Sequence, residues 1–153
     1  MNGLEYAVAR KAVRLANLIS TKRNADIKEM GLTAAQADAL VFFAQNAGST
    51  VSDLKDDLGV THQTASGIVE RMIKKDLLTT RVSQEDARCR AVYLPEQGER
   101  IHDRFLVNGS RTGGYLLCGM DERQREEFLA LLTRAAENLE TVDTDAEKSG
   151  ENA

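Results

Sequence analysis

The sequence is poor in the residues that mark secreted, metal-binding and cofactor-binding proteins. Its 153 residues include no tryptophan, one proline, two cysteines and two histidines. Two cysteines are too few for a secreted disulfide scaffold. Neither His62 nor His102 stands at metal-ligand spacing with Cys89 or Cys118. The sequence therefore predicts no disulfide framework, no metal site and no cofactor.

Signals for membranes, secretion and catalysis are also missing. No apolar run approaches the length that crosses a bilayer, and the first residues, MNGLE, lack the basic-then-apolar layout of a secretion signal. No G-x-S-x-G, G-x-G-x-x-G or paired-acid motif occurs. We therefore expect a cytoplasmic protein that has no membrane partner and is not an enzyme. A hydrophobic content of 42% supports a domain with a real core.

A helix-turn-helix is predicted in the first part of the segment 51–94. Ser52 is a good N-cap for a first short helix, and Gly59 supplies the left-handed residue that ends it. Thr61 can cap a second helix. That helix carries apolar residues at i, i+3, i+4, i+7 and i+8, namely Ala65, Ile68, Val69, Met72 and Ile73. Two helices joined by a glycine-containing turn of this length are typical of a helix-turn-helix.

The polar face of the second helix is the predicted DNA-reading surface. Its side chains are short, they donate and accept hydrogen bonds, and no carboxylate precedes Glu70. Such a face at a helix N-terminus suits base edges and phosphates in a major groove. The alternative is an ordinary solvated helix face, and for His62 a solvated histidine. The residues of the helix-turn-helix expected to contact DNA are Ser52, Thr61, His62, Gln63, Thr64, Ser66, Gly67 and Arg71.

A β-hairpin is predicted after this helix. Residues 77–82 and 91–94 are apolar and β-branched, and the polar segment 83–90 separates them. A hairpin after a recognition helix is a wing. Arg88 and Arg90 near its tip would enter a minor groove, where negative potential favours arginine. Asp86 would hold the tip by pairing with Arg88 or a neighbouring arginine.

In their order and spacing these residues resemble the MarR family of winged-helix transcriptional regulators. The resemblance rests on SDL, GVTHQTASGIVERMIKKDLL, EDAR and VYL, together with GLT before the helix-turn-helix and GMDE ahead of the last helix. It extends over about residues 10–140. It implies a homodimer built by the N- and C-terminal helices, and a small phenolic, aromatic or lipophilic effector. Three positions depart from the family pattern, namely Gly67, where a larger, often basic residue is common, Asp76 in place of glycine and Pro95 in place of threonine.

The predicted architecture is a single domain, residues 1–153, mainly α-helical with a small β-hairpin wing. The winged helix-turn-helix spans about 33–94, dimerisation helices span about 4–29 and 95–140, and residues 141–153 are expected to form a frayed tail. Thr33 and Asp121 are predicted caps. Three glycines within residues 107–114 favour a kink, loop or flexible break over a phosphate-binding loop, because no Gly-Lys-Ser/Thr follows. Tyr115, Leu116 and Leu117 are expected to return to the core.

The charge distribution fits a DNA-binding face on an acidic chain. The net charge is −4, but residues 119–153 hold ten acidic against four basic residues. Residues 60–90 hold six basic against four acidic residues, and residues 1–30 hold six against three. Because charge acts on phosphates over roughly 8 Å at physiological salt, a locally basic face is sufficient.

The predicted function is sequence-specific binding of double-stranded DNA by a homodimeric transcriptional repressor. Its operator would be pseudo-palindromic, and a small effector would modulate its affinity. One alternative is a redox sensor acting through Cys89, whose neighbours Arg88 and Arg90 would favour the thiolate; against it stands an unreactive wing cysteine. A second alternative is a winged-helix module that binds only protein. Cys118 is expected to be a small apolar residue at a helix interface.

Overall fold

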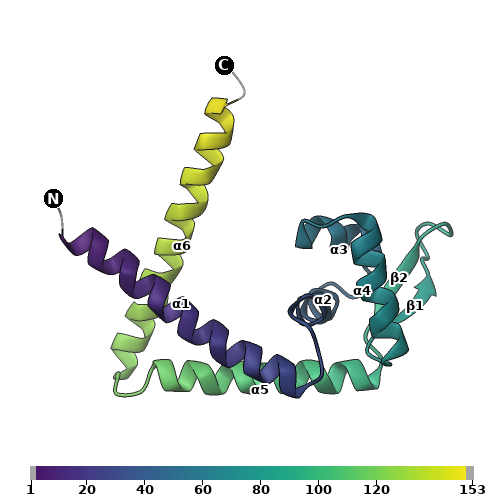
Figure 1. The fold of residues 1–153 in the computed structure, drawn as a ribbon, viewed down its shortest axis with the longest axis horizontal. Helices are drawn as coiled ribbons and strands as arrows, with labels where there is room; N and C mark the ends of the chain where they lie inside the picture. Colours follow the sequence, from purple (N-terminus) through teal and green to yellow (C-terminus); the bar gives the residue numbers. More distant parts are fainter. Residues whose placement is uncertain (1–2, 151–153) are drawn as a thin grey trace. The chain divides into compact units, whose positions relative to one another are not determined.

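The computed structural model describes the backbone of residues 3–150 and the side chains of residues 3–142, and it is mainly helical (Figure 1). Within these residues there are six helices and two strands: α1 (Gly3–Glu29), α2 (Ala34–Gln45), α3 (Val51–Leu58), α4 (His62–Lys74), β1 (Thr79–Val82), β2 (Arg90–Tyr93), α5 (Glu96–Leu116) and α6 (Glu122–Gly150). The predicted fold class, a helical chain with one hairpin, is confirmed.

The chain divides into two compact units. Unit 1 is Met1–Thr112 and contains α1 to α4, the hairpin and most of α5; unit 2 is Gly113–Ala153 and contains the end of α5 and α6. The predicted dimerisation region at 95–140 thus contains two helices, which a turn at residues 117–121 separates. The frayed tail expected from residue 141 is not observed, since α6 continues to Gly150, and residues 151–153 lie outside the described part.

The glycine-rich segment 107–114 does not interrupt α5, contrary to the prediction of a kink, loop or break. The helix runs from Glu96 to Leu116. Gly109, Gly113 and Gly114 have no neighbouring atom within 4 Å of the position of a Cβ. Each glycine costs up to about 1 kcal/mol in a helix relative to alanine, which weakens the helix without breaking it.

Four helices begin at side chains that accept hydrogen bonds from the first turn. Thr33, Thr61 and Asp121 cap α2, α4 and α6 as predicted, with N···O distances of 3.2, 3.2 and 2.9 Å. The prediction of Ser52 as a cap was wrong. Thr50 caps α3 instead, accepting from the Asp53 backbone at 3.3 Å, while the Asp53 carboxylate accepts from the Thr50 backbone at 2.8 Å. This reciprocal pair is a capping box.

Three helices are followed, within two residues of their last one, by a residue with positive φ. Gly31 and Gly59 have φ of 71° and 64°, which glycine adopts without a steric penalty. At the end of α4 the corresponding residue is Asp76, with φ of 59°. The backbone N–H of Leu77 donates to the Met72 carbonyl at 2.9 Å, so this end has the hydrogen bond of a Schellman motif. Asp76 occupies a conformation that favours glycine.

One apolar core lies in unit 1, under the helix-turn-helix. Its buried members come from α1, the α1–α2 turn, α2, α3, α4, the turn before β1, β2 and α5; the largest fully buried ones are Leu40, Phe43, Leu54, Met72, Leu78 and Val92. The predicted stripe of α4 contributes Ala65, Ile68, Val69 and Met72. Ile73 is the exception, because its side chain is 39% exposed.

The wing is an antiparallel hairpin in which Thr79 lies opposite Tyr93 and Val82 opposite Arg90. Strand β1 is shorter than predicted, since Leu77 and Leu78 are buried in the core ahead of it, whereas β2 has the predicted length and begins one residue earlier. The segment between α2 and α3 pairs with the other edge of β2. Val92 accepts from the Gly48 N–H and donates to the Ser49 carbonyl, both at 2.9 Å. These bonds fix the wing to the helix-turn-helix.

The start of α5 packs closely against the turn that follows α4. A Cβ on Gly98 would lie 2.3 Å from the backbone oxygen of Leu77. Such a distance is far inside van der Waals contact, and a backbone atom cannot move aside as a side chain does. Glycine at position 98 therefore permits this approach, which holds α5 against the end of the recognition helix.

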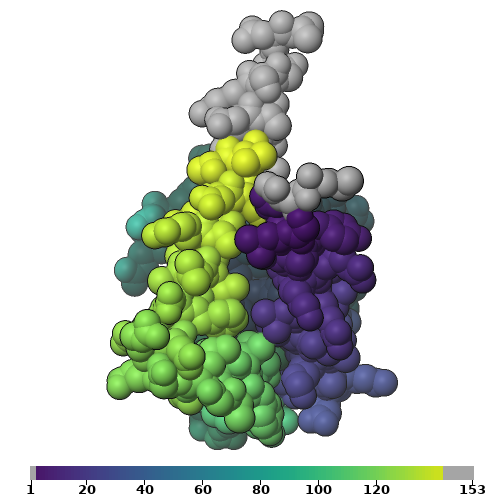
Figure 2. All heavy atoms as spheres, turned by 90° about the vertical axis from the view of Figure 1, so that its left-hand side faces the viewer, coloured from purple at the N-terminus to yellow at the C-terminus, as the bar shows by residue number. Residues whose placement is uncertain are grey.

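The outer helices leave most of their apolar side chains exposed. In α1 the one buried residue is Ile27, and Figure 2 shows α1 side chains, in purple, on the face turned to the viewer. Other exposed apolar residues are Leu106, Val107 and Tyr115 in α5, and Leu129, Leu131, Leu132, Leu139 and Val142 in α6. Tyr115 is 65% exposed, so it does not join the core of the chain as predicted, and Cys118 is exposed in a turn.

Candidate nucleic-acid interface

Helix α4 presents polar side chains along the side opposite its buried stripe. His62, Gln63 and Thr64 are exposed in its first turn, and Ser66 and Gly67 are partly buried one turn later. The Thr61 and Thr64 hydroxyls lie 2.9 Å apart in a hydrogen bond, and Thr61 also caps the helix. The free donors and acceptors closest to the N-terminus are therefore those of His62 and Gln63.

A shallow hollow of about 580 Å³ lies on this face of α4. Its lining comes entirely from α4 and consists of Gln63, Thr64, Ser66, Gly67, Glu70 and Arg71. The structure thus brings together five of the residues predicted to contact DNA. It also adds Glu70, which the sequence analysis treated as the end of the polar face. A carboxylate among donors and hydroxyls can accept a bond from the amino group of cytosine.

Arg71 reaches back along the helix over Gly67. A Cβ at position 67 would lie 3.6 Å from Nη2, 3.8 Å from Nη1 and 3.9 Å from Cζ of Arg71. Helical side chains lean toward the N-terminus, so residue i+4 covers residue i. The guanidinium of Arg71 therefore lies where a side chain at position 67 would extend.

Ser52 lies apart from this hollow, as an exposed residue in the first turn of α3. Its predicted cap role belongs to Thr50, so its hydroxyl is not required for the start of α3. Helices α3 and α4 lie against one another (Figure 1), and Leu54 and the α4 stripe belong to the same buried core. A phosphate contact by Ser52 stays a prediction.

The wing places Arg88 and Arg90 differently. Arg88 stands in the loop, where its backbone N–H donates to Asp86 Oδ1 at 2.9 Å. Arg90 begins β2, and its Nη1 donates to Thr80 Oγ1 across the hairpin at 3.2 Å. Both are exposed. The predicted pairing of the Asp86 carboxylate with an arginine side chain was wrong, because the carboxylate binds the backbone of the loop.

Cys89 interacts with the same carboxylate. Its Sγ lies 3.8 Å from Asp86 Oδ2 in a weak hydrogen bond, and its thiol is free and exposed. The redox hypothesis depended on the cations Arg88 and Arg90 beside this thiol. Within the described part of the chain, the thiol interacts with an anion, the Asp86 carboxylate, instead. This geometry does not favour redox sensing over an unreactive wing cysteine.

The sequence analysis missed Lys75, which anchors the end of the recognition helix. Its Nζ donates to the Gly31 carbonyl at 2.8 Å and to Gln36 Oε1 at 3.3 Å. Gln36 is the buried polar residue of the core, and its Oε1 also accepts from the Thr33 backbone. Lys75 and Gly31 are 44 residues apart, so no local pattern could have indicated this contact.

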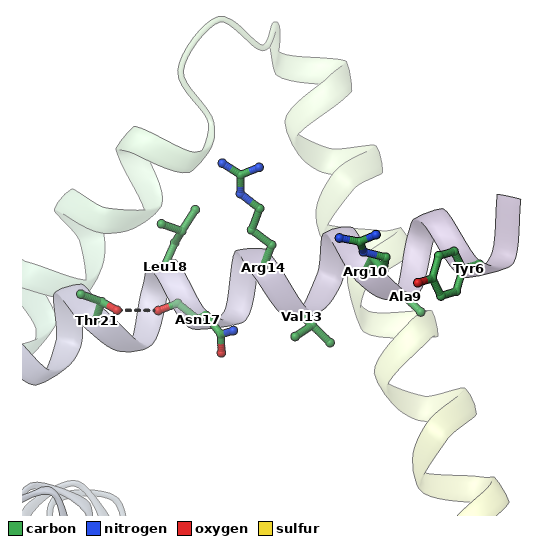
Figure 3. A pocket seen from close by; sticks show the side chains of 8 residues that line it. All are labelled: Tyr6, Ala9, Arg10, Val13, Arg14, Asn17, Leu18 and Thr21. Carbon is green, nitrogen blue, oxygen red and sulfur yellow. Dashed lines mark hydrogen bonds between the residues drawn. The ribbon is translucent and has the colours of Figure 1, made fainter. Parts of the chain in front are cut away.

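Two hollows away from α4 could accept small molecules. One, of about 510 Å³, lies along α1 and is lined by Tyr6, Ala9, Arg10, Val13, Arg14, Asn17, Leu18 and Thr21 (Figure 3). The other, of about 360 Å³, lies between α2, β2 and the first half of α5, with Phe43, Tyr93, Glu99, His102 and Asp103 among its lining residues. The described residues contain no group of three potential metal ligands and no helix able to cross a membrane.

Comparisons with known proteins agree with this geometry. Residues 30–88, from the α1–α2 turn to the wing, match the model of the MarR family. A relative in Bacillus subtilis, the uncharacterized HTH-type transcriptional regulator YybA, is 20% identical over 133 residues, which cover 87% of this chain and 89% of the relative. The predicted resemblance to the MarR family is therefore confirmed.

Solved structures share the fold. A MarR transcriptional regulator from Methanosarcina mazei Go1 is 20% identical, with a TM-score of 0.70 over 90% of this chain and 99% of its own. A single-residue mutant of MepR from S. aureus is 19% identical, with a TM-score of 0.73 over 86% of this chain and 97% of its own. MepR from S. aureus in a complex with DNA is 20% identical, with a TM-score of 0.66 over 82% and 95%.

Proposed function

We propose that this chain is a DNA-binding transcriptional regulator of the MarR type, and that it acts as a homodimer and as a repressor on a pseudo-palindromic operator. One α4 from each protomer would enter the major groove, and the two grooves would lie about 34 Å apart. A small ligand would change the affinity for DNA. Each of these points goes beyond the resemblance to the family.

The observation that carries the proposal is the division of α4 into two faces. Four apolar residues of α4 are buried, whereas His62, Gln63 and Thr64 stand exposed at the helix N-terminus. Groups of this kind pair with base edges. The partial positive charge of the helix N-terminus would attract the phosphates. The likeness to MepR, a protein solved in a complex with DNA, supports the same use of this face.

Homodimer formation is supported by the apolar surface of the outer helices. Leu4, Tyr6, Val8, Val13 and Leu18 of α1 are all more than half exposed. Monomeric proteins rarely leave so many large apolar side chains in water along one helix. A two-fold dimer would bury them as identical surfaces on both protomers. Light scattering at micromolar concentration should give twice the mass of one chain, and a monomer would refute the dimer.

Effector binding is supported by the hollow between α2, β2 and α5, which lies beside the winged helix. Tyr93 offers aromatic surface to a ligand, the buried Phe43 lies behind the lining, and Glu99 and Asp103 add carboxylates. An aromatic ligand without a negative charge fits this lining better than an anionic one, because like charges repel. We expect neutral or cationic aromatic compounds to raise the melting temperature of the protein, and Glu99→Gln to change which compounds do so.

The deciding experiment is a gel shift with the DNA upstream of the chain's own coding sequence. The full-length protein should retard this fragment at concentrations that leave random DNA of equal length unbound. Affinity should fall steeply with salt, because phosphate contacts release counterions. Equal binding to both fragments would exclude sequence-specific regulation. No binding to either would favour a module that binds only protein.

The redox alternative is tested in the same assay. Mild peroxide should leave the affinity for DNA unchanged in the unmodified protein. A loss of affinity that thiol reverses, and that Cys89→Ser abolishes, would instead establish Cys89 as a sensor.

A further inference from the structure

We infer that Arg71, placed over Gly67, reads a guanine in each half of the operator. Gly67 is the residue that makes this contact possible. The inference rests on the proposed function and adds the residue pair that sets base preference. The family pattern, with a larger and often basic residue at position 67, suggests the opposite, namely that glycine there removes a contact from the reading face.

The first step is the position of the guanidinium. Arg71 lies in the third turn of α4, beyond the half of a recognition helix that usually meets base edges. Its side chain extends toward the N-terminus, so Nη1, Nη2 and Cζ all lie within 4 Å of the Cβ position at Gly67. Four residues of helix correspond to about 6 Å. The charged end therefore sits about one turn closer to the reading half than its own backbone does.

The second step is the space that glycine leaves. Nη1, Nη2 and Cζ of Arg71 all approach the same point above the backbone, so a large side chain at position 67 would compete with the guanidinium for this volume. Gly67 has a negative φ and lies inside the helix, so no turn or backbone strain requires glycine there. The three atoms nearest to the position of a Cβ on Gly67 all belong to Arg71. The space it leaves is used by arginine.

The third step is the surroundings of the guanidinium. Arg71 lines the hollow on α4 together with Gln63, Thr64 and Ser66. No hydrogen bond or ion pair of the described residues employs its side chain, and Glu70 beside it forms no ion pair with it. Its planar donors remain available for an acceptor pair. Guanine offers such a pair, O6 and N7, in the major groove, and arginine binds it with two parallel hydrogen bonds.

The test is selection of binding sites from a random DNA library by the full-length protein and its variants. The unmodified protein should enrich a pseudo-palindrome with one strongly selected G·C pair in each half. Arg71→Lys keeps the charge but loses the fork of donors. It should lower the preference at that one pair by about tenfold and leave the other positions unchanged. Lys74→Ala removes a nearby exposed cation that lies outside the hollow, and it should retain the full preference.

Gly67→Leu provides a second test, because it should displace the guanidinium while Arg71 itself stays unchanged. It should lose preference at the same G·C pair as Arg71→Lys. In an Arg71→Ala background it should cause no further loss at that pair, since the two changes remove one contact. Circular dichroism confirms that each variant is folded, and leucine has a better helix propensity than glycine.

The outcomes separate the inference from the proposed function. If the unmodified protein enriches no sequence, the proposed function fails and the inference fails with it. If it enriches a palindrome and Arg71→Lys selects the same bases with the same strength, only the inference is wrong. A uniform loss of affinity with an unchanged base preference would identify Arg71 as a phosphate contact and would also overturn the inference.

Discussion

Asp86 accepts a hydrogen bond from the backbone N–H of Arg88, at 2.9 Å from Oδ1, and so shapes the wing loop through its main chain. The second oxygen of the same carboxylate lies 3.8 Å from Cys89 Sγ. Ser83 Oγ contributes from the other side, accepting from the backbone of Glu85 and Asp86 at 3.3 and 3.4 Å. The loop is thus held by side chain–backbone bonds that do not involve the guanidinium of Arg88.

This relationship predicts opposite effects of two substitutions at position 86. Asp86→Ala should weaken DNA binding although it removes a negative charge, because the backbone N–H of Arg88 loses the side-chain oxygen that accepts its hydrogen bond. Asp86→Asn also removes the charge but keeps an acceptor oxygen, so it should bind at least as tightly as the unmodified protein. Fluorescence anisotropy at matched salt measures both. Tighter binding by Asp86→Ala would mean that Asp86 is an ordinary solvated charge.

Arg88→Ala should reduce both affinity and its dependence on salt. Removing one cation from the phosphate region should lower the slope of log affinity against log salt by about one for each protomer. The free energy of unfolding should change by less than about 0.5 kcal/mol, because an exposed loop residue contributes little to stability. Arg104→Ala, an exposed cation on α5, serves as the control and should leave the slope unchanged.

Gln63→Ala should weaken specific binding alone. A glutamine that bonds adenine N6 and N7 contributes roughly 1–3 kcal/mol of discrimination. Affinity for the selected operator should fall by that amount, while affinity for random DNA should stay nearly constant. Competition titrations measure the two side by side, with Gln97→Ala in α5 as the matched change outside α4. Equal losses on both DNAs would show that the reading face is assigned wrongly.

Two glycines of α5 should respond to alanine in opposite directions. Gly98→Ala would bring a Cβ to 2.3 Å from the Leu77 backbone oxygen, so it should lower the free energy of unfolding by about 1–3 kcal/mol or more. Gly109→Ala meets open space in the same helix and should raise it by up to about 1 kcal/mol. Urea unfolding at one fixed protein concentration compares them. A neutral Gly98→Ala would contradict the close approach of α5 to this turn.

Asp76→Gly should stabilise the protein. Asp76 has φ of 59°, and a left-handed conformation costs a residue with a Cβ about 1–2 kcal/mol, less for aspartate than for most. Part of the gain is lost because glycine has more freedom in the unfolded chain, so we expect an increase of up to about 1 kcal/mol. Asp57→Gly, inside α3, should lower stability by a similar amount. Thermal unfolding of the two variants measures the difference in sign.

Local chemistry allowed much of the helix-turn-helix to be predicted. Threonine before α2 and before α4, and glycine after α3, determine where these helices begin and end, because their atoms act within four residues. The error at Ser52 is of the same kind. Thr50 has the Thr-x-x-Asp spacing of a capping box, and that signal was available in the sequence. The apolar period of α4 identified four buried residues. The burial predicted for Ile73 was wrong, because this residue lies at the edge of the stripe.

The outer helices were harder to predict, because amphipathic periodicity does not say which surface covers an apolar face. Tyr115 was expected in the core of the chain and is exposed. The glycines of α5 were expected to break the helix. Glycine lowers helix propensity by about 1 kcal/mol, and the remainder of the helix compensates for that cost. A weak local preference of this size cannot decide whether a long helix continues.

The sequence by itself determined the order of elements, the cap residues, the buried stripe of α4 and the polar side chains beside it, since each depends on spacing within a few turns. The tertiary structure alone decided the contacts between distant or flexible groups. Lys75 reaches Gly31, Leu77 lies against Gly98, Asp86 binds backbone instead of arginine, and Arg71 lies over Gly67. These contacts depend on which rotamer a long side chain adopts and on where one segment meets another, and neither is encoded in the spacing of residues along the chain.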